Sequence, residues 1–92
     1  MAVGLRIKLA GVSVEQFDRL DAAVNAREDH PDGLIFSASG PIDAGWEVID
    51  FWDSRAHFDR FAQERIGPAV QAAGLTVQPE IHEFPIHEYV TR

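Results

Sequence analysis

The sequence predicts an α+β fold of the ferredoxin-like kind, with the element order β-α-β-β-α-β. Three observations predict it: an alternating apolar segment opens the chain, two segments have helical apolar spacing, and further strand-like segments lie between and after them. This order usually gives a four-stranded antiparallel sheet with both helices on one face and the first and third strands in the middle. With 92 residues, we expect a single domain over residues 1–92.

The chain begins with a strand and a helix. Apolar and polar or small residues alternate over residues 3–9, and this period of two is typical of a strand. Ser13 is expected to cap a helix, because apolar residues from Val14 to Val24 recur at spacings of three and four. The helix should end near Arg27, where turn-forming residues begin.

A hairpin is predicted in the middle of the chain. Residues 29–33 are rich in turn formers, and residues 34–39 follow as a second strand. The segment 40–45 contains glycine and proline and is expected to connect this strand to a third. Residues 46–52 form that third strand, because they are rich in aromatic and β-branched side chains.

The second helix and the last strand complete the order. Ser54 is expected to cap the helix, and its apolar residues between Phe58 and Ile66 form one stripe. Gly67-Pro68 should interrupt it, and a short helical segment ending at Gly74 should follow. The last strand is predicted over residues 81–90, with an edge or a bulge at Pro85, since proline removes one ladder hydrogen bond.

Both faces of the predicted sheet carry large apolar groups, although the helices cover only one. In the third strand, Trp46 and Trp52 share one face with Asp50, while Ile49 and Phe51 lie on the other. A small chain with so much apolar sheet surface usually buries it against a second copy. We therefore expect a homodimer whose two sheets face each other.

Composition excludes several functional classes. Eight basic against fifteen acidic side chains give a net charge of −7, which argues against a nucleic-acid or anionic-membrane partner. The chain has no cysteine, so disulfides, thiolate catalysis and cysteine-ligated metals are excluded. No segment approaches the ~20 apolar residues of a membrane span, and the first residues lack a signal-peptide pattern, so we expect a cytoplasmic protein.

The sequence resembles the dimeric α+β barrel superfamily, and most closely its small antibiotic-biosynthesis-monooxygenase-like members. The resemblance rests on the element order, on the segment 45–54 (GWEVIDFWDS), on Phe58-Asp59-Arg60-Phe61, and on the break at 65–69. It implies a barrel formed by two chains, with a small-molecule pocket between sheet and helices in each. Those members include cofactor-free oxygenases of polyketide-type aromatics, polyketide cyclases and haem-degrading enzymes.

The function implied is that of a small-molecule monooxygenase or polyketide cyclase acting on an aromatic or polyketide-like substrate, without a cofactor. The alternative is a non-catalytic ligand-binding or structural homodimer of the same fold. A third alternative is a haem-handling protein with a histidine as axial ligand. The chain departs from the oxygenase and haem-degrading pattern at one point, since those members tend to use a pocket asparagine. The only asparagine here, Asn25, lies late in the first helix.

His87 and Tyr89 are candidates for acid–base chemistry. They are two residues apart, so on a strand they share a face with Glu83. Inside an apolar pocket, His87 would remove a proton and Tyr89 would stabilise an enolate or carbonyl oxygen. Alternatively, both rings lie at the barrel rim or the subunit interface, where amphipathic rings are common.

Asp50 is the third catalytic candidate, as the group that orients a base or the substrate. It lies between aromatic neighbours on a strand expected to be central, and a buried carboxylate must be paired or protonated. The first strand neighbours the third, so Arg6 or Lys8 is the expected partner. The alternative is an ion pair that only fixes strand register or subunit contacts.

The remaining candidates are substrate-binding residues. Trp46, Trp52 and Phe36 are expected to form pocket walls, His30 to lie at the pocket mouth, and Arg6 to contact the ligand. No metal site is predicted. His82 and His87 are five apart on a strand and point to opposite faces, whereas the helical zinc motif spaces its histidines by four.

Overall fold

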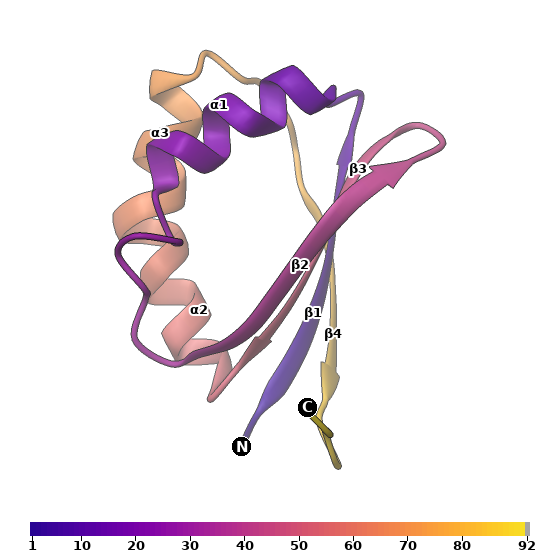
Figure 1. Cartoon of the computed structure of the whole chain (residues 1–92), viewed down its shortest axis with the longest axis vertical. Coiled ribbons are helices and arrows are strands. Elements are labelled where there is room, and N and C mark those ends of the chain that lie inside the picture. Colours follow the sequence, from indigo (N-terminus) through magenta and orange to yellow (C-terminus); the bar gives the residue numbers. More distant parts are fainter. Residues whose placement is uncertain (92) are drawn as a thin grey trace.

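A computed structural model describes residues 1–91 and contains one four-stranded antiparallel sheet. Its strands are β1 (Val3–Ala10), β2 (Leu34–Ile42), β3 (Gly45–Trp52) and β4 (Glu80–Pro85), in the order β2-β3-β1-β4. The first and third strands therefore lie in the middle, and the predicted ferredoxin-like α+β fold is confirmed. All helices cover one face of the sheet, and the other face is open (Figure 1).

Two serines begin the main helices as predicted. Ser13 caps α1 (Val14–Val24) with a capping box, in which its hydroxyl accepts from the Gln16 amide and the Gln16 side chain accepts from the Ser13 amide. Ser54 caps α2 (Arg55–Phe61) by accepting from the His57 amide. Among the described residues, no helix is long and apolar enough to cross a membrane.

The predicted break at Gly67-Pro68 takes the form of a π-helical turn within a continuous helical path. Residues Ala62–Ile66 (η1) join α2 to α3 (Gly67–Ala72), and the Gly67 amide donates to the Ala62 carbonyl. Pro68 has no amide hydrogen, and its ring would meet the carbonyl four residues earlier in a regular helix. The wider turn accommodates the proline without ending the helix.

Strand register separates the side chains onto two faces. Leu5 lies opposite Asp50 and Ile7 opposite Val48, so these residues face the helices and the core. Gly4 lies opposite Phe51 and opposite Phe84 on the other side, so these residues belong to the face without helices. We call that surface the open face; its apolar members are Gly4, Ala10, Phe36, Ala38, Ile42, Ile49, Phe51 and Phe84, and it also carries Arg6, Lys8, Glu47, Glu80 and His82.

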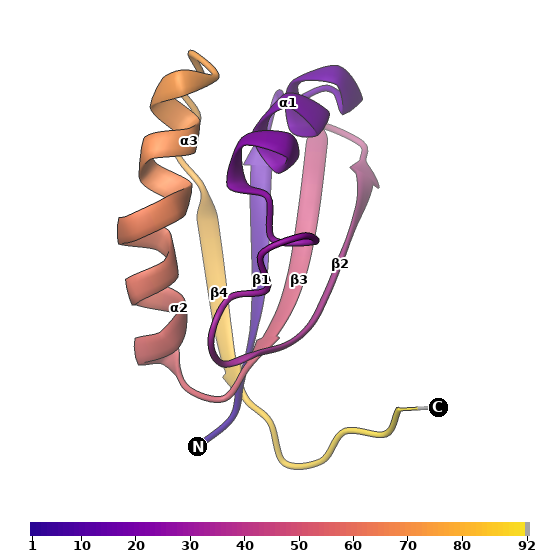
Figure 2. The ribbon, with the colours of Figure 1, turned by 60° about the vertical axis from the view of Figure 1, so that its left-hand side comes forward.

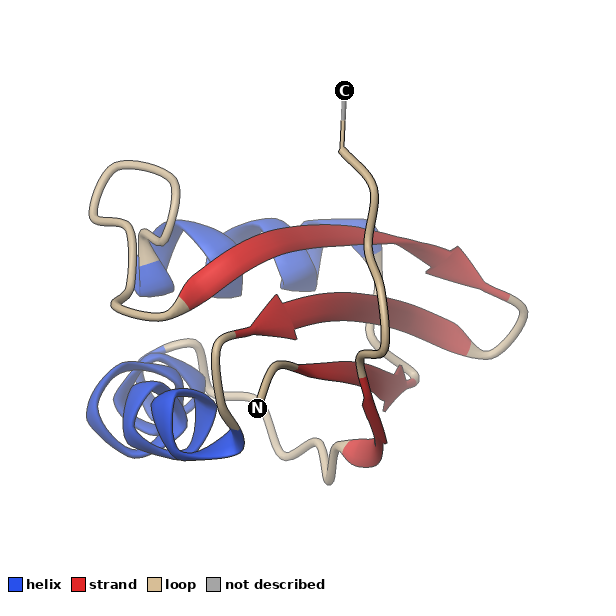
Figure 3. Cartoon of the chain, turned by 90° about the horizontal axis from the view of Figure 1, so that it is seen from below, coloured by secondary structure: helices blue, strands red, loops and turns tan. Residues whose placement is uncertain are grey.

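The last strand is shorter than the sequence indicated, and the predicted end at Val90 is wrong. β4 ends at Pro85, which lies opposite Val3. Beyond the proline, the Ile86 amide still donates to the Ala2 carbonyl, but residues 87–91 have no strand partner. This segment leaves the β4 edge and runs across the strand direction towards the β2 side (Figures 2 and 3).

Candidate functional site

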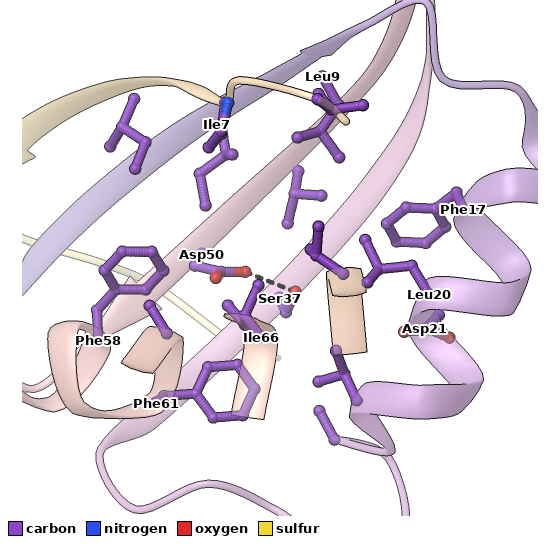
Figure 4. A pocket seen from close by; sticks show the side chains of 18 of the residues that line it. Ile7, Leu9, Phe17, Leu20, Asp21, Ser37, Asp50, Phe58, Phe61 and Ile66 are labelled. Atoms are coloured by element: carbon purple, nitrogen blue, oxygen red, sulfur yellow. Dashed lines mark hydrogen bonds between the residues drawn. The ribbon is translucent and has the colours of Figure 1, made fainter. Parts of the chain in front are cut away.

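A cavity of about 230 Å³ lies between the sheet and the helices. Figure 4 shows side chains from β1, β2, β3, α1, α2 and η1 converging on it. Its wall is almost entirely aliphatic and aromatic, with Phe17, Leu20, Val48, Phe58, Phe61 and Ile66 among the lining residues. Such a surface favours a hydrophobic ligand, and polar groups within it then determine how the ligand is oriented.

Asp50 is the buried polar group of this cavity. Its side chain faces the helices because β3 places it in register with Leu5, and the residue is only 6% exposed. The Ser37 hydroxyl on β2 donates to Oδ1 at 2.7 Å, and the Trp52 indole donates to Oδ2 at 3.2 Å. Each oxygen therefore has one donor, and neither contacts a cationic side chain of residues 1–91.

Burial raises the pKa of Asp50 above its usual 3.8, although the hydrogen bonds from Ser37 and Trp52 oppose this change. Desolvation dominates because the surrounding side chains are apolar and give the charged form little support. A carboxyl group in this setting is suited to exchanging a proton with a bound molecule.

Asp50→Asn is expected to stabilise the protein at neutral pH. Because the pKa of Asp50 is raised, the folded state holds this proton more tightly than the unfolded chain does. The resulting stabilisation is fully present below pH 3.8 and is lost as pH rises through the raised pKa. Asparagine does not titrate, so the variant should gain ~1 kcal/mol at pH 7, or ~5 °C in melting temperature.

Melting curves of both proteins between pH 3 and pH 8 check this. The difference in melting temperature should shrink towards zero at the acidic end. A difference that stayed constant across the range would contradict a raised pKa for Asp50.

Of the predicted wall residues, Trp52 lines the cavity, and Trp46 and Phe36 lie elsewhere. Trp46 stacks on Phe17, with ring centroids 4.9 Å apart, and lines a shallow groove beside the loop that follows β1. Phe36 lies on the open face, where it stacks on Phe51 at 5.9 Å.

The expected ion pair between Asp50 and Arg6 or Lys8 is absent, and this expectation is wrong. Residues alternate along β1, so Arg6 and Lys8 point to the open face when Leu5 faces Asp50. Arg6 instead donates to Glu47 Oε1 at 2.8 Å. Arg6 therefore does not line the cavity around Asp50.

The predicted histidine and tyrosine positions lie outside this cavity. His30 lies 2.8 Å from the Leu34 carbonyl through Nε2, and it lines a second, more polar cavity together with His57, Arg60 and Arg65. His87 and Tyr89 belong to the segment after β4. Their roles in binding and catalysis stay predictions. Within residues 1–91, no group of three or more histidine, aspartate or glutamate side chains is placed to hold a metal ion.

Two polar residues at the cavity were not among the predicted site residues. Ser37 faces Asp50 across β2 and β3, and its parity with Asp50 follows only once the strand register is known. Asp21 is an exposed α1 residue that lines the cavity one position after Leu20. From the apolar spacing of the helix, Asp21 is expected to be a surface residue, and nothing in the sequence indicates that it borders a cavity.

Comparison with known proteins shows similarity in structure. The sequence matches no protein-family model and no curated protein. One similar structure is that of SnoaB, a cofactor-independent oxygenase from Streptomyces nogalater, crystallised as an asparagine-to-alanine variant. The two sequences are 14% identical and the TM-score is 0.71. The match covers 99% of this chain and 98% of the SnoaB chain.

Two further solved structures are similar over nearly their whole length. A proposed antibiotic biosynthesis monooxygenase from Deinococcus radiodurans is 16% identical with a TM-score of 0.64, covering 100% of this chain and 98% of its own. Rv0793 from Mycobacterium tuberculosis is 15% identical with a TM-score of 0.65, and the match covers 99% of this chain and 100% of the Rv0793 chain. The chain therefore has the fold of antibiotic biosynthesis monooxygenase-like proteins, as the sequence resemblance indicated.

Proposed function

We propose that this protein is a small-molecule enzyme of the monooxygenase kind, acting on an aromatic or polyketide-like substrate in the cavity between sheet and helices. The observation that carries the proposal is the buried carboxyl group of Asp50 in an otherwise apolar cavity. The similarity in fold to SnoaB, a cofactor-independent oxygenase, supports the same class of reaction.

The geometry suits oxidation of an electron-rich ring. Aromatic side chains, including Phe58 and Phe61, provide surfaces against which a flat substrate stacks. The Asp50 carboxylate accepts the proton of a phenolic hydroxyl, while Ser37 and Trp52 hold the carboxylate in place. Loss of this proton makes the ring a better electron donor towards molecular oxygen.

For 1-naphthol, the overall reaction is balanced without an added reductant. One naphthol and one O₂ give one 1,4-naphthoquinone and one water. The ring loses two hydrogens and gains one oxygen atom, and the second oxygen atom leaves as water. Molecular oxygen is therefore both the oxidant and the source of the new carbonyl oxygen.

Cyclisation of a polyketide chain uses the same residues differently. There, Asp50 would remove a proton next to a carbonyl, and ring closure would follow without oxygen. The roles predicted from the sequence, His87 as base and Tyr89 as oxyanion donor, stay an alternative to Asp50 as base, because both residues lie outside this cavity in the single chain. If His87 has this role, the His87→Ala variant loses turnover.

Oxygen uptake in the presence of 1-naphthol tests the proposed oxygenation. We expect uptake above the rate in buffer, with 1,4-naphthoquinone as product, and a loss of ~100-fold or more in Asp50→Asn. Asp18→Asn is the matched control, because it makes the same substitution at an exposed position of α1 outside the cavity. Uptake no faster than in buffer would contradict an oxygenase acting on this substrate class.

We also propose that two chains associate through their open faces. Phe36 is 49% exposed and stacks on Phe51, so large aromatic surface meets solvent in the single chain. The Phe84 ring lies directly over Gly4, where an added Cβ would come within 2.2 Å of a ring carbon. The Phe84 ring thus joins Phe36 and Phe51 in an apolar cluster at one end of the open face, which a second copy of the same sheet would cover.

A further inference from the structure

The charges around the cavity are of one sign. Two acidic residues, Asp21 and Asp50, line it, and no lysine, arginine or histidine among the described residues does so. Apart from Ser37 and the Trp52 indole, every other lining residue has an apolar side chain. A ligand that enters therefore meets carboxyl groups and no countercharge for an anion.

Two arginines that lie over rings of the cavity wall, Arg55 over Phe58 and Arg65 over Phe61, are engaged elsewhere. Arg55 pairs with Asp59 at 2.8 Å and also with Glu83 on β4. Arg65 donates to the Val24 carbonyl at 2.7 Å and lies over the Phe61 ring at 5.0 Å. Each guanidinium would have to give up existing partners before it reached a ligand inside the cavity.

Asp50 retains hydrogen-bonding capacity for a neutral ligand. Each of its oxygens accepts one hydrogen bond, so each keeps a further acceptor position. In its ionised form it can accept from a phenolic hydroxyl, and in its protonated form it can donate to a carbonyl. Both partners are uncharged groups, and neither requires a buried countercharge.

The size of the cavity limits the ligand as well. At about 230 Å³ it lies below the ~300–1,000 Å³ usual for drug-sized ligands. One or two fused aromatic rings suit this volume better than a larger polycycle.

We propose that the cavity selects uncharged one- or two-ring phenols and ketones over aromatic carboxylates, and that Asp50 is the specificity-determining residue. This inference rests on the proposed function, because it names the substrate class of the same site. An aromatic carboxylate would lose its hydration on entering and would meet the Asp50 carboxyl, with no cationic side chain among the described lining residues to pair with it.

Calorimetric titration with 1-naphthol and 1-naphthoate at pH 7 tests the inference. The two probes share one ring system, but the first is neutral and the second is ionised. Wild-type protein should bind naphthol at least ~10-fold more tightly than naphthoate. In Asp50→Asn the ratio should fall severalfold, while in the control Asp18→Asn it should match the wild type.

The outcomes separate the two proposals. Binding of naphthol and naphthoate with equal affinity to wild-type protein would overturn the selectivity and leave the cavity as a binding site. An unchanged ratio in Asp50→Asn, shown to be folded by its melting curve, would overturn the role of Asp50. Absence of binding for both probes would overturn the proposed function and the inference with it.

Discussion

Trp52→Ala should lower the free energy of unfolding by ~3–5 kcal/mol, the largest single effect on stability that we expect. Trp52 is fully buried, and its ring contacts Phe58 edge-on at 5.8 Å and Phe61 at 5.3 Å between centroids. Removal of the indole leaves a cavity that the rigid strands cannot close. It also removes the hydrogen bond that the indole N–H donates to Asp50. A domain typically has only ~5–15 kcal/mol of stability in total, so the variant should lose a large fraction of it.

Urea denaturation at one protein concentration measures this effect. Val90→Ala serves as the control, because Val90 is 85% exposed and its truncation should change stability by less than ~0.5 kcal/mol. A cost for Trp52→Ala as small as that of the control would show that the indole does not support the core as the structure indicates.

Phe51→Lys should dissociate the proposed dimer. Phe51 lies on the inner strand β3, opposite Gly4 on β1 and stacked on Phe36 of β2, within the aromatic cluster of the open face. A lysine there would bring its charge into an apolar interface, and loss of a central aromatic contact typically costs ~2 kcal/mol or more. The dissociation constant should therefore rise at least ~30-fold.

Sedimentation velocity across a range of concentrations follows this change. Gln63→Lys adds the same charge to an exposed position of the helical layer and should leave the dimer intact. If wild-type protein sediments as a monomer at micromolar concentrations, the open face is not a self-association surface. Equal effects of both variants would point to net charge and not to the position of Phe51.

Much of the fold follows from local patterns in the sequence. Alternation in β1 and β3 reports burial on one face, and Ser13 and Ser54 mark helix starts because their hydroxyls can satisfy free amides. The π-helical turn was predicted only as an interruption, since its form depends on how the chain accommodates Pro68. The early end of β4 depends on whether a partner strand continues beyond Pro85, which local pattern does not report.

The site was predictable for residues whose position in the strand alternation places them on the buried face of the sheet. Asp50 and Trp52 share a face with the core residues of β3, and both line the cavity. Arg6 was expected beside Asp50 because their strands are neighbours, but its own parity directs it to the open face. Phe36 has the opposite parity from Ser37, and an irregularity between Leu34 and Phe36 sets the final register. Pairings such as Ser37 with Asp50 depend on that register, which single-strand patterns leave open.

A ¹⁵N NMR titration with 1-naphthol, followed at the two indole N–H signals, tests most directly whether the cavity beside Asp50 binds a small aromatic molecule. Trp52 lines the cavity and Trp46 does not. Trp46→Phe and Trp52→Phe assign the two signals. We expect the Trp52 signal to move most and to saturate. If neither signal moves, or if the Trp46 signal alone moves, the ligand does not bind beside Asp50 and the account of the site is contradicted.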